Sequence, residues 1–181
     1  ANFKTDAMKI LRVHAYEAFS ETVKYIDFSK FDLVIFVAEH IRDYVEARFG
    51  EMNSVVIPNG INIKAFTIGE KDGKKIAFAG YISRKKGVGE IELLARSLPE
   101  YEFHIAGRYQ EDDIADYFNK QCPENVFIHP WQYDINSFYS DKTFILNTSM
   151  REGCPVAVLE GMAAGLKPLV RGWVGADKIF D

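Results

Sequence analysis

Short apolar runs alternate with amphipathic stretches along most of the chain. The runs are rich in β-branched and aromatic residues, which is typical of strands. Strands are predicted at Ile10–His14, Leu33–Val37, Ser54–Ile57, Lys75–Ala79, Glu102–Ala106, Val126–His129, Thr143–Asn147 and Pro168–Val170. Helices are predicted between them at Glu39–Phe49, Gly89–Leu98, Asp112–Lys120 and Val156–Ala164. This alternation indicates an α/β fold with parallel sheets covered by helices on both faces.

Residues 58–74, PNGINIKAFTIGEKDGK, interrupt the alternation with turn residues and charges but no regular period. The three strands predicted before this segment are too few for an independent doubly wound sheet, and a new strand–helix series follows it. We therefore expect a two-domain protein. Residues 1–58 are predicted to be the last strand–helix units of a first domain that lies mostly outside this sequence, residues 59–74 a linker, and residues 75–181 a second domain.

Composition excludes several classes of protein. Hydrophobic residues make up 48% of the 181 residues and charged residues 27%, the usual balance of a soluble globular protein. The net charge of -4 does not favour binding to nucleic acid. No apolar run is long enough to cross a bilayer, and the start of the chain does not resemble a signal peptide. Cys122 and Cys154 form neither a disulfide framework nor a metal-binding cluster, so a cytoplasmic location is expected.

The segment Thr148–Leu169, TSMREGCPVAVLEGMAAGLKPL, has the features of an anion-binding site. Pro155 suits the first turn of a helix, and the amides of Val156–Val158 are then expected to lack acceptors at the positive helix end. A phosphate is a natural ligand for such amides. Gly153 has no side chain that would obstruct the approach of a ligand.

Glu160 is the only ionisable residue between Val156 and Leu166. A helix this apolar is expected to be buried, and a lone carboxylate inside it is unfavourable unless it forms hydrogen bonds. Two interpretations fit equally well. Glu160 binds a sugar or ribose hydroxyl, or it is a structural residue bonded to a neighbouring loop.

The sequence Glu152-Gly-Cys-Pro-Val-Ala-Val-Leu-Glu160, followed by Gly-Met-Ala-Ala-Gly, resembles the signature of retaining glycosyltransferases of family 4. That signature has two glutamates separated by seven residues, after a strand that often ends in serine, here Ser149. The resemblance extends over about residues 9–180. It implies the GT-B architecture of two Rossmann-like domains, with a doubly wound donor-binding domain in the second half of this chain.

The resemblance also covers the loop Gly80–Gly87, which is similar to the loop after the first donor-domain strand. In the family an arginine usually follows the first glycine and a lysine precedes the second. Lys86 matches the lysine, but Tyr81 replaces the arginine. Either Arg84 supplies the second positive charge or contact with the donor diphosphate is weaker here.

Three further residues lie where the family has functional groups. Trp131 lies where relatives hold the nucleotide base, so it stacks on the base or simply packs against the protein. His14 ends a strand that, in the family, presents a histidine to the donor sugar, although a lone histidine is more often structural. Arg108 follows a strand end that faces the cleft, where an exposed surface arginine is favoured over a phosphate contact.

The resemblance implies sugar transfer from a nucleotide-sugar donor with retention of configuration. The proposed donor-binding residues are Gly80, Arg84, Lys86, Trp131, Gly153, Cys154, Pro155, Val156 and Glu160. Glu160 would hold the ribose hydroxyls, while Glu152 and His14, the candidate catalytic residues, would contact the transferred sugar. No metal or cofactor is expected. A carbohydrate or lipid-linked acceptor, and any peripheral contact with a membrane, are expected to involve the missing domain, so this fragment alone is expected to be inactive.

Other enzyme classes lack support in the sequence. There is no G-x-G-x-x-G after a strand and no P-loop, which disfavours nicotinamide enzymes and P-loop nucleotidases. Residues 111–113, Glu-Asp-Asp, are better explained by the start of a helix than by a metal site. Two alternatives remain: a non-catalytic module that binds sugar nucleotides, and a sugar-nucleotide epimerase of the GT-B architecture.

Overall fold

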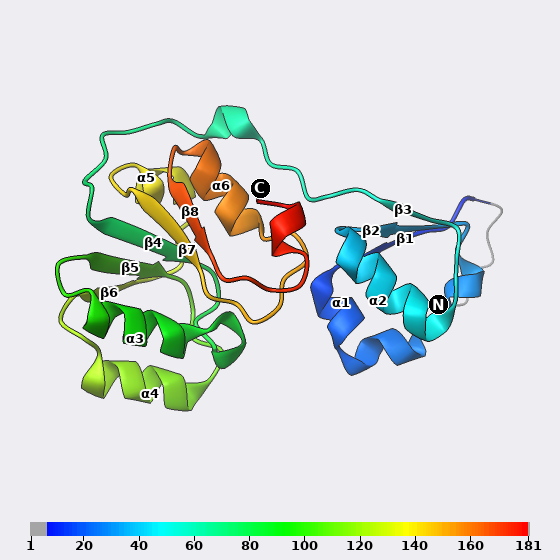
Figure 1. Cartoon of the computed structure of the whole chain (residues 1–181), viewed down its shortest axis with the longest axis horizontal. Coiled ribbons are helices and arrows are strands. Elements are labelled where there is room, and N and C mark those ends of the chain that lie inside the picture. Colours follow the sequence, from blue (N-terminus) through cyan, green and yellow to red (C-terminus); the bar gives the residue numbers. More distant parts are fainter. Residues whose placement is uncertain (1–6, 181) are drawn as a thin grey trace. The chain divides into compact units, whose positions relative to one another are not determined.

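The computed structural model describes residues 7–180 and contains two parallel sheets (Figure 1). The chain divides into two compact units. The first unit comprises residues up to 59, residues 151–154 and residues from 177 onward; the second comprises residues 60–150 and 155–176. No helix within residues 7–180 is both long enough and apolar enough to cross a membrane.

The first unit is built on a three-stranded parallel sheet of order β1-β2-β3. Its strands are β1 (Ile10–Val13), β2 (Leu33–Phe36) and β3 (Ser54–Val56). Helices α1 (Ala15–Phe19) and α2 (Glu39–Phe49) follow the first two strands. The fully buried side chains of this unit include Val13, Val34, Phe36, Ile41 and Val45, which come from both sheet and helix.

The second unit has five parallel strands in the order β6-β5-β4-β7-β8. The strands are β4 (Lys75–Ala79), β5 (Glu102–Ala106), β6 (Val126–His129), β7 (Phe144–Asn147) and β8 (Lys167–Val170). The helices are α3 (Val88–Ser97), α4 (Asp112–Gln121), α5 (Ile135–Tyr139) and α6 (Val156–Ala163). Figure 1 shows α3 and α4 on one face of the sheet and α5 and α6 on the other, as right-handed crossovers require. The predicted doubly wound α/β fold is therefore confirmed.

Side chains that alternate along the strands form the core beneath α3 and α4. This core comprises Ile76, Phe78, Ile82, Val88, Ile91, Ala95, Phe103, Ile105, Ile114, Phe118, Val126 and Leu146. The strand ends coincide with the predicted ends or differ from them by one residue, within the usual uncertainty of boundaries. The helices α1 and α5 were not predicted, because five residues are too few to show a helical period of hydrophobicity.

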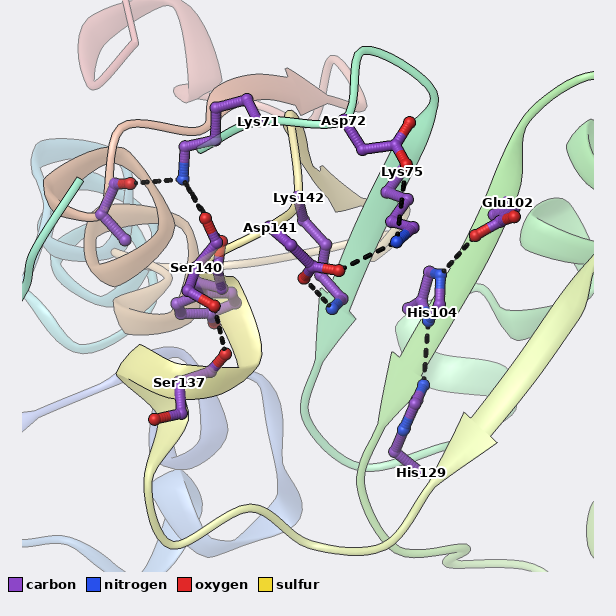
Figure 2. Close-up of polar contacts among 12 residues, drawn as sticks. Lys71, Asp72, Lys75, Glu102, His104, His129, Ser137, Ser140, Asp141 and Lys142 are labelled. Atoms are coloured by element: carbon purple, nitrogen blue, oxygen red, sulfur yellow. Dashed lines mark hydrogen bonds and ion pairs between the residues drawn. The ribbon is translucent and has the colours of Figure 1, made fainter. Parts of the chain in front are cut away.

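Within the second unit, residues 67–72 pack against α5 and α6, and Lys71 lies at the C-terminal ends of both helices (Figure 2). The Lys71 ammonium donates to the backbone carbonyls of Tyr139, Ser140 and Ala164, at 3.3, 3.4 and 2.8 Å. A cation is favourable at these negative helix ends. Gly69 lies so close to the carbonyl oxygen of Ser140 that a Cβ would be 2.3 Å from it. This segment therefore fixes the end of α6 opposite the helix start where phosphate binding is predicted.

Candidate donor-binding site

The strand order of the second unit reverses between β4 and β7, since later strands are added on opposite sides of this pair. In doubly wound folds, ligands bind at the C-terminal ends of the strands that flank such a switch point. The loop Gly80–Gly87 follows β4, and Thr148 follows β7. The topology thus brings the two segments with predicted phosphate-binding residues to one edge of the sheet.

Direct contacts join these two segments. The Thr148 hydroxyl donates to the carbonyl oxygen of Lys86 at 2.8 Å, and the Met150 amide donates to the carbonyl oxygen of Lys85 at 3.4 Å. Gly87 adopts a left-handed conformation with φ of 71°, and a Cβ there would lie 2.2 Å from the carbonyl oxygen of Thr148. Glycine is required here both by conformation and by space.

Helix α6 begins at Val156, with Pro155 as its N-cap rather than its first helical residue. The amide of Val158 donates to the carbonyl oxygen of Pro155 at 3.2 Å, so the prediction that this amide lacks an acceptor is wrong. This bond joins residues three apart, so the tight first turn of α6 satisfies the Val158 amide within the helix. Within residues 7–180, the amides of Val156 and Ala157 have no acceptor. The helix start therefore offers two N–H groups to an anion.

Two buried oxygens at the end of β7 also lack partners among the described residues. These are Oδ1 of Asn147 and Oγ of Ser149, whose residues are 7% and 0% exposed. Unsatisfied buried oxygens are rare, and such groups are often completed by water or ligand hydroxyls. Sequence analysis pointed to Ser149 through the resemblance but missed Asn147. The signal for it was a polar residue at the end of an otherwise apolar strand.

Glu160 is half-buried in α6, and its carboxylate forms no hydrogen bond or ion pair with the described residues. The structural interpretation requires a hydrogen bond between Glu160 and a neighbouring loop, and no such bond is present within residues 7–180. Burial raises the pKa of Glu160. Fully buried Tyr139 donates its hydroxyl to the carbonyl oxygen of Ala157 at 3.3 Å. Burial, and secondarily the charge of Glu160, raises the pKa of Tyr139.

Arg84 forms an ion pair with a residue of α4, so its charge is already partly neutralised. Its guanidinium forms an ion pair with Asp113, and its backbone amide donates to Glu111 at 3.1 Å. The hydrogen bond and charge of Asp113 raise the pKa of Arg84. Lys86 is partly buried and lies in the same 3₁₀ turn, Arg84–Lys86, capped by the buried hydroxyl of Ser83.

No group of His, Cys, Asp and Glu side chains within residues 7–180 is arranged to hold a metal ion.

Trp131 lies in a cluster with Tyr81 and Arg108 at the same edge of the sheet. The ring centroids of Trp131 and Tyr81 are 5.9 Å apart, and the Arg108 guanidinium carbon lies 5.5 Å from the Trp131 ring. Trp131 is 40% exposed and Tyr81 is 46% exposed. Trp131 therefore rests on side chains of its own unit but keeps much of its surface accessible.

Residues 151–154 belong to the first unit. The Nε2 atom of His40 lies 2.8 Å from the carbonyl oxygen of Glu152, and the Asn59 amide donates to the carbonyl oxygen of Cys154 at 2.8 Å. A Cβ on Gly153 would lie 2.8 Å from Cγ2 of Val37. The expected open space at Gly153 is thus filled by the protein, because the loop packs closely against Val37 and Ala15. Cys154 is buried, which raises the pKa of its thiol.

His14 follows β1 and is the N-cap of α1. Its backbone amide donates to the Glu17 carboxylate at 3.0 Å, while its ring is partly exposed. The Cβ of the next residue, Ala15, is 3.5 Å from the Cβ position of Gly153. The first unit therefore brings the backbone next to Glu152 against the start of α1, immediately after His14.

Comparison with known proteins shows the family of this chain. Residues 61–179 match the family described as "Glycosyl transferases group 1". An uncharacterized glycosyltransferase of Haemophilus influenzae is 24% identical over 155 residues, which cover 81% of this chain and 43% of that protein. The lipopolysaccharide 1,6-galactosyltransferase of Salmonella typhimurium is 23% identical over 160 residues, with the same coverage. The chain thus spans less than half the length of these relatives.

The structure is also similar to S. aureus TarM, solved as a mutant in complex with Fondaparinux, alpha-GlcNAc-glycerol and UDP. The TM-score is 0.79 and the identity 23%, over 98% of this chain and 40% of TarM. A likeness at this identity shows a shared fold.

Proposed function

Since the chain belongs to the group 1 glycosyl transferases, we propose that it binds the nucleotide-sugar donor of a glycosyl transfer reaction. The observation that carries this proposal is the contact between the Gly80–Gly87 loop and the end of β7 at the switch point of the sheet. This contact places a lysine-containing loop beside the segment that leads to α6, whose first two amides have no acceptor in the described chain. Cations and open amides together suit a diphosphate.

We assign the parts of the donor to residues of the second unit. Lys86 and the amides at Val156 bind the diphosphate, and Gly80 keeps the loop clear of side chains. Glu160 accepts hydrogen bonds from the ribose hydroxyls, which would satisfy its half-buried carboxylate. Trp131 stacks on the nucleobase with its exposed surface. Because Arg84 is paired with Asp113, its contribution requires that this exposed ion pair opens.

In the first unit, Glu152 and His14 are proposed to contact the transferred sugar, and transfer is proposed to retain its configuration. In a front-face reaction the donor phosphate accepts the proton of the acceptor hydroxyl. The side chains then position the sugar and stabilise charge rather than act as the base. The reaction needs no metal or cofactor in this proposal, because cations and helix amides neutralise the leaving diphosphate.

The acceptor is proposed to be a carbohydrate, free or lipid-linked, in keeping with the lipopolysaccharide named for the Salmonella relative. The matched relatives are more than twice as long as the matched region. We propose that acceptor binding depends mainly on a domain that this sequence does not cover. The 181-residue chain would then bind a donor but transfer sugar poorly, because it cannot hold both reactants together.

Calorimetry with UDP, GDP and ADP, in the presence and absence of EDTA, tests the donor site. We expect weak binding of at least one nucleotide, unaffected by EDTA and weakened by salt. Glu160→Gln should weaken this binding, whereas Glu100→Gln, at an exposed position, should not. If no nucleotide binds at millimolar concentration, or if binding requires a metal, the proposal fails.

A further inference from the structure

We propose that Arg108 is a second diphosphate-binding cation of the donor site. This inference rests on the proposed function and names a residue that the signature does not contain. Three observations support it: the alignment of the loops after β4 and β5, the ion pair that occupies Arg84, and the stacking of the Arg108 guanidinium on Trp131.

The loops after β4 and β5 continue the pairing of their strands. Ala79 is aligned with Ala106, and Ile82 forms a parallel bridge with Tyr109. The amide of Ile82 donates to the carbonyl oxygen of Arg108 at 2.8 Å. The same offset at both points places Tyr81 directly beside Arg108.

This close pairing depends on Gly107. A Cβ on Gly107 would lie 1.8 Å from the carbonyl oxygen of Gly80, so only glycine permits the two loops to approach. Neighbouring strands are about 4.8 Å apart, and aligned residues of parallel strands point to the same face. Tyr81 and Arg108 accordingly both contact the ring of Trp131. Arg108 thus lies one strand away from Tyr81, the position at which the family usually has an arginine.

The charge of Arg108 is not neutralised by any acidic side chain within residues 7–180. Arg108 is exposed and forms no ion pair with the residues that the structure describes. Arg84, on the β4 loop itself, is paired with Asp113. Arg108 therefore lies beside the β4 loop with a guanidinium that can form an ion pair with an anionic ligand.

Trp131 orients the guanidinium without neutralising its charge. Stacking on an indole face restricts a flexible side chain and leaves its N–H donors available. The planar group then matches two oxygens of a phosphate. Because Arg108 emerges from a strand end held by backbone hydrogen bonds, it is positioned before the ligand arrives.

The test compares UDP, UMP and uridine as ligands of the wild type and of Arg108→Ala. We expect Arg108→Ala to weaken UDP binding about tenfold and uridine binding less than twofold, since the missing contact is to phosphate. Lys120→Ala removes an exposed positive charge at the end of α4 and should leave both affinities unchanged. Thermal unfolding of each variant verifies that it is folded.

A relocation variant sharpens the test. Tyr81→Arg in the Arg108→Ala background should restore most of the UDP affinity, because an arginine side chain can bridge the distance of about 4.8 Å between neighbouring strands. Loss of equal size for UDP and uridine would overturn the proposal and assign Arg108 to the nucleoside. Unchanged UDP affinity in Arg108→Ala, with loss in Glu160→Gln, would overturn it while leaving the donor site intact. Absence of binding of UDP, GDP and ADP by the wild type at millimolar concentration would overturn both.

Discussion

The Nδ1 atom of His104 and the Nε2 atom of His129 lie 3.0 Å apart on neighbouring strands (Figure 2). The other ring nitrogen of His104 lies 3.1 Å from the Glu102 carboxylate. A single proton can lie between the two facing nitrogens, so the rings cannot both be charged in this arrangement. Burial lowers the pKa of both histidines; mutual repulsion and Lys142 add to the shift at His129.

This pair predicts a loss of stability on mild acidification. The folded-state pKa values of the histidines lie below the ordinary value of about 6.5. The unfolded chain therefore binds more protons than the folded chain as pH falls below about 6.5, and the free energy of unfolding decreases. His129→Gln removes one titrating ring and should flatten the dependence of the melting temperature on pH between about 6.5 and 5. NMR titration of the imidazoles verifies the assignment. A variant with the wild-type pH dependence would contradict this explanation.

Asp141 predicts a second loss of stability, at lower pH. Burial opposes its ionisation, but hydrogen bonds and charge from Lys142 and Lys75 lower its pKa to about 2. The contribution is therefore present above the ordinary pKa of about 3.9 and lost as pH falls toward 2. Asp141→Asn should lower the melting temperature at pH 7 by about 2 °C, since the carboxylate is partly screened by solvent.

The matched control for this ion-pair cluster is Asp72→Asn. Asp72 is also near Lys75, but its distance is 3.5 Å, compared with 3.0 Å for Asp141. A smaller change in melting temperature is expected for it. The difference between Asp141→Asn and the wild type should disappear near pH 2. A difference that persists there would mean that packing, not charge, is responsible.

Glu160→Gln should increase stability and decrease donor binding. Because burial raises the pKa of Glu160, ionisation above that pKa disfavours the folded state. The neutral variant should melt at a higher temperature than the wild type at pH 7, and the two should converge as pH falls below about 4.3. UDP affinity, measured at pH 7, should decrease in the same protein. A variant that gains stability yet binds UDP normally would show that Glu160 does not contact the donor.

Gly87→Ala should destabilise the second unit and weaken UDP binding. The left-handed φ of 71° and the 2.2 Å approach to the Thr148 carbonyl leave no room for a methyl group. A loss of about 2 kcal/mol in the free energy of unfolding is expected from denaturant titration. Gly89→Ala, two residues later, meets no atom within 4 Å and serves as the control. It should be neutral or slightly stabilising, since Gly89 lies inside a helix; equal losses in both variants would refute the steric argument.

Local pattern was sufficient to predict most strands and the longer helices of both units. Apolar runs such as Lys75–Ala79 are dictated by burial on two faces of a parallel sheet, and that requirement is visible in the composition of each run. The alternation of strands and helices also predicted the doubly wound topology. The signature around Glu160 indicated a glycosyltransferase, in agreement with the group 1 match of residues 61–179. These features depend on neighbours in the sequence.

The contacts that shape the candidate site depend instead on residues far apart in the chain. Arg84 turns to Asp113, Val37 fills the space beside Gly153, and Tyr81 aligns with Arg108. None of these pairs has a local signal, because each forms only when strands and loops distant in sequence are brought together. The tertiary structure therefore decided which cation remains open to a ligand, since the charge available at a site depends on all the groups packed around it.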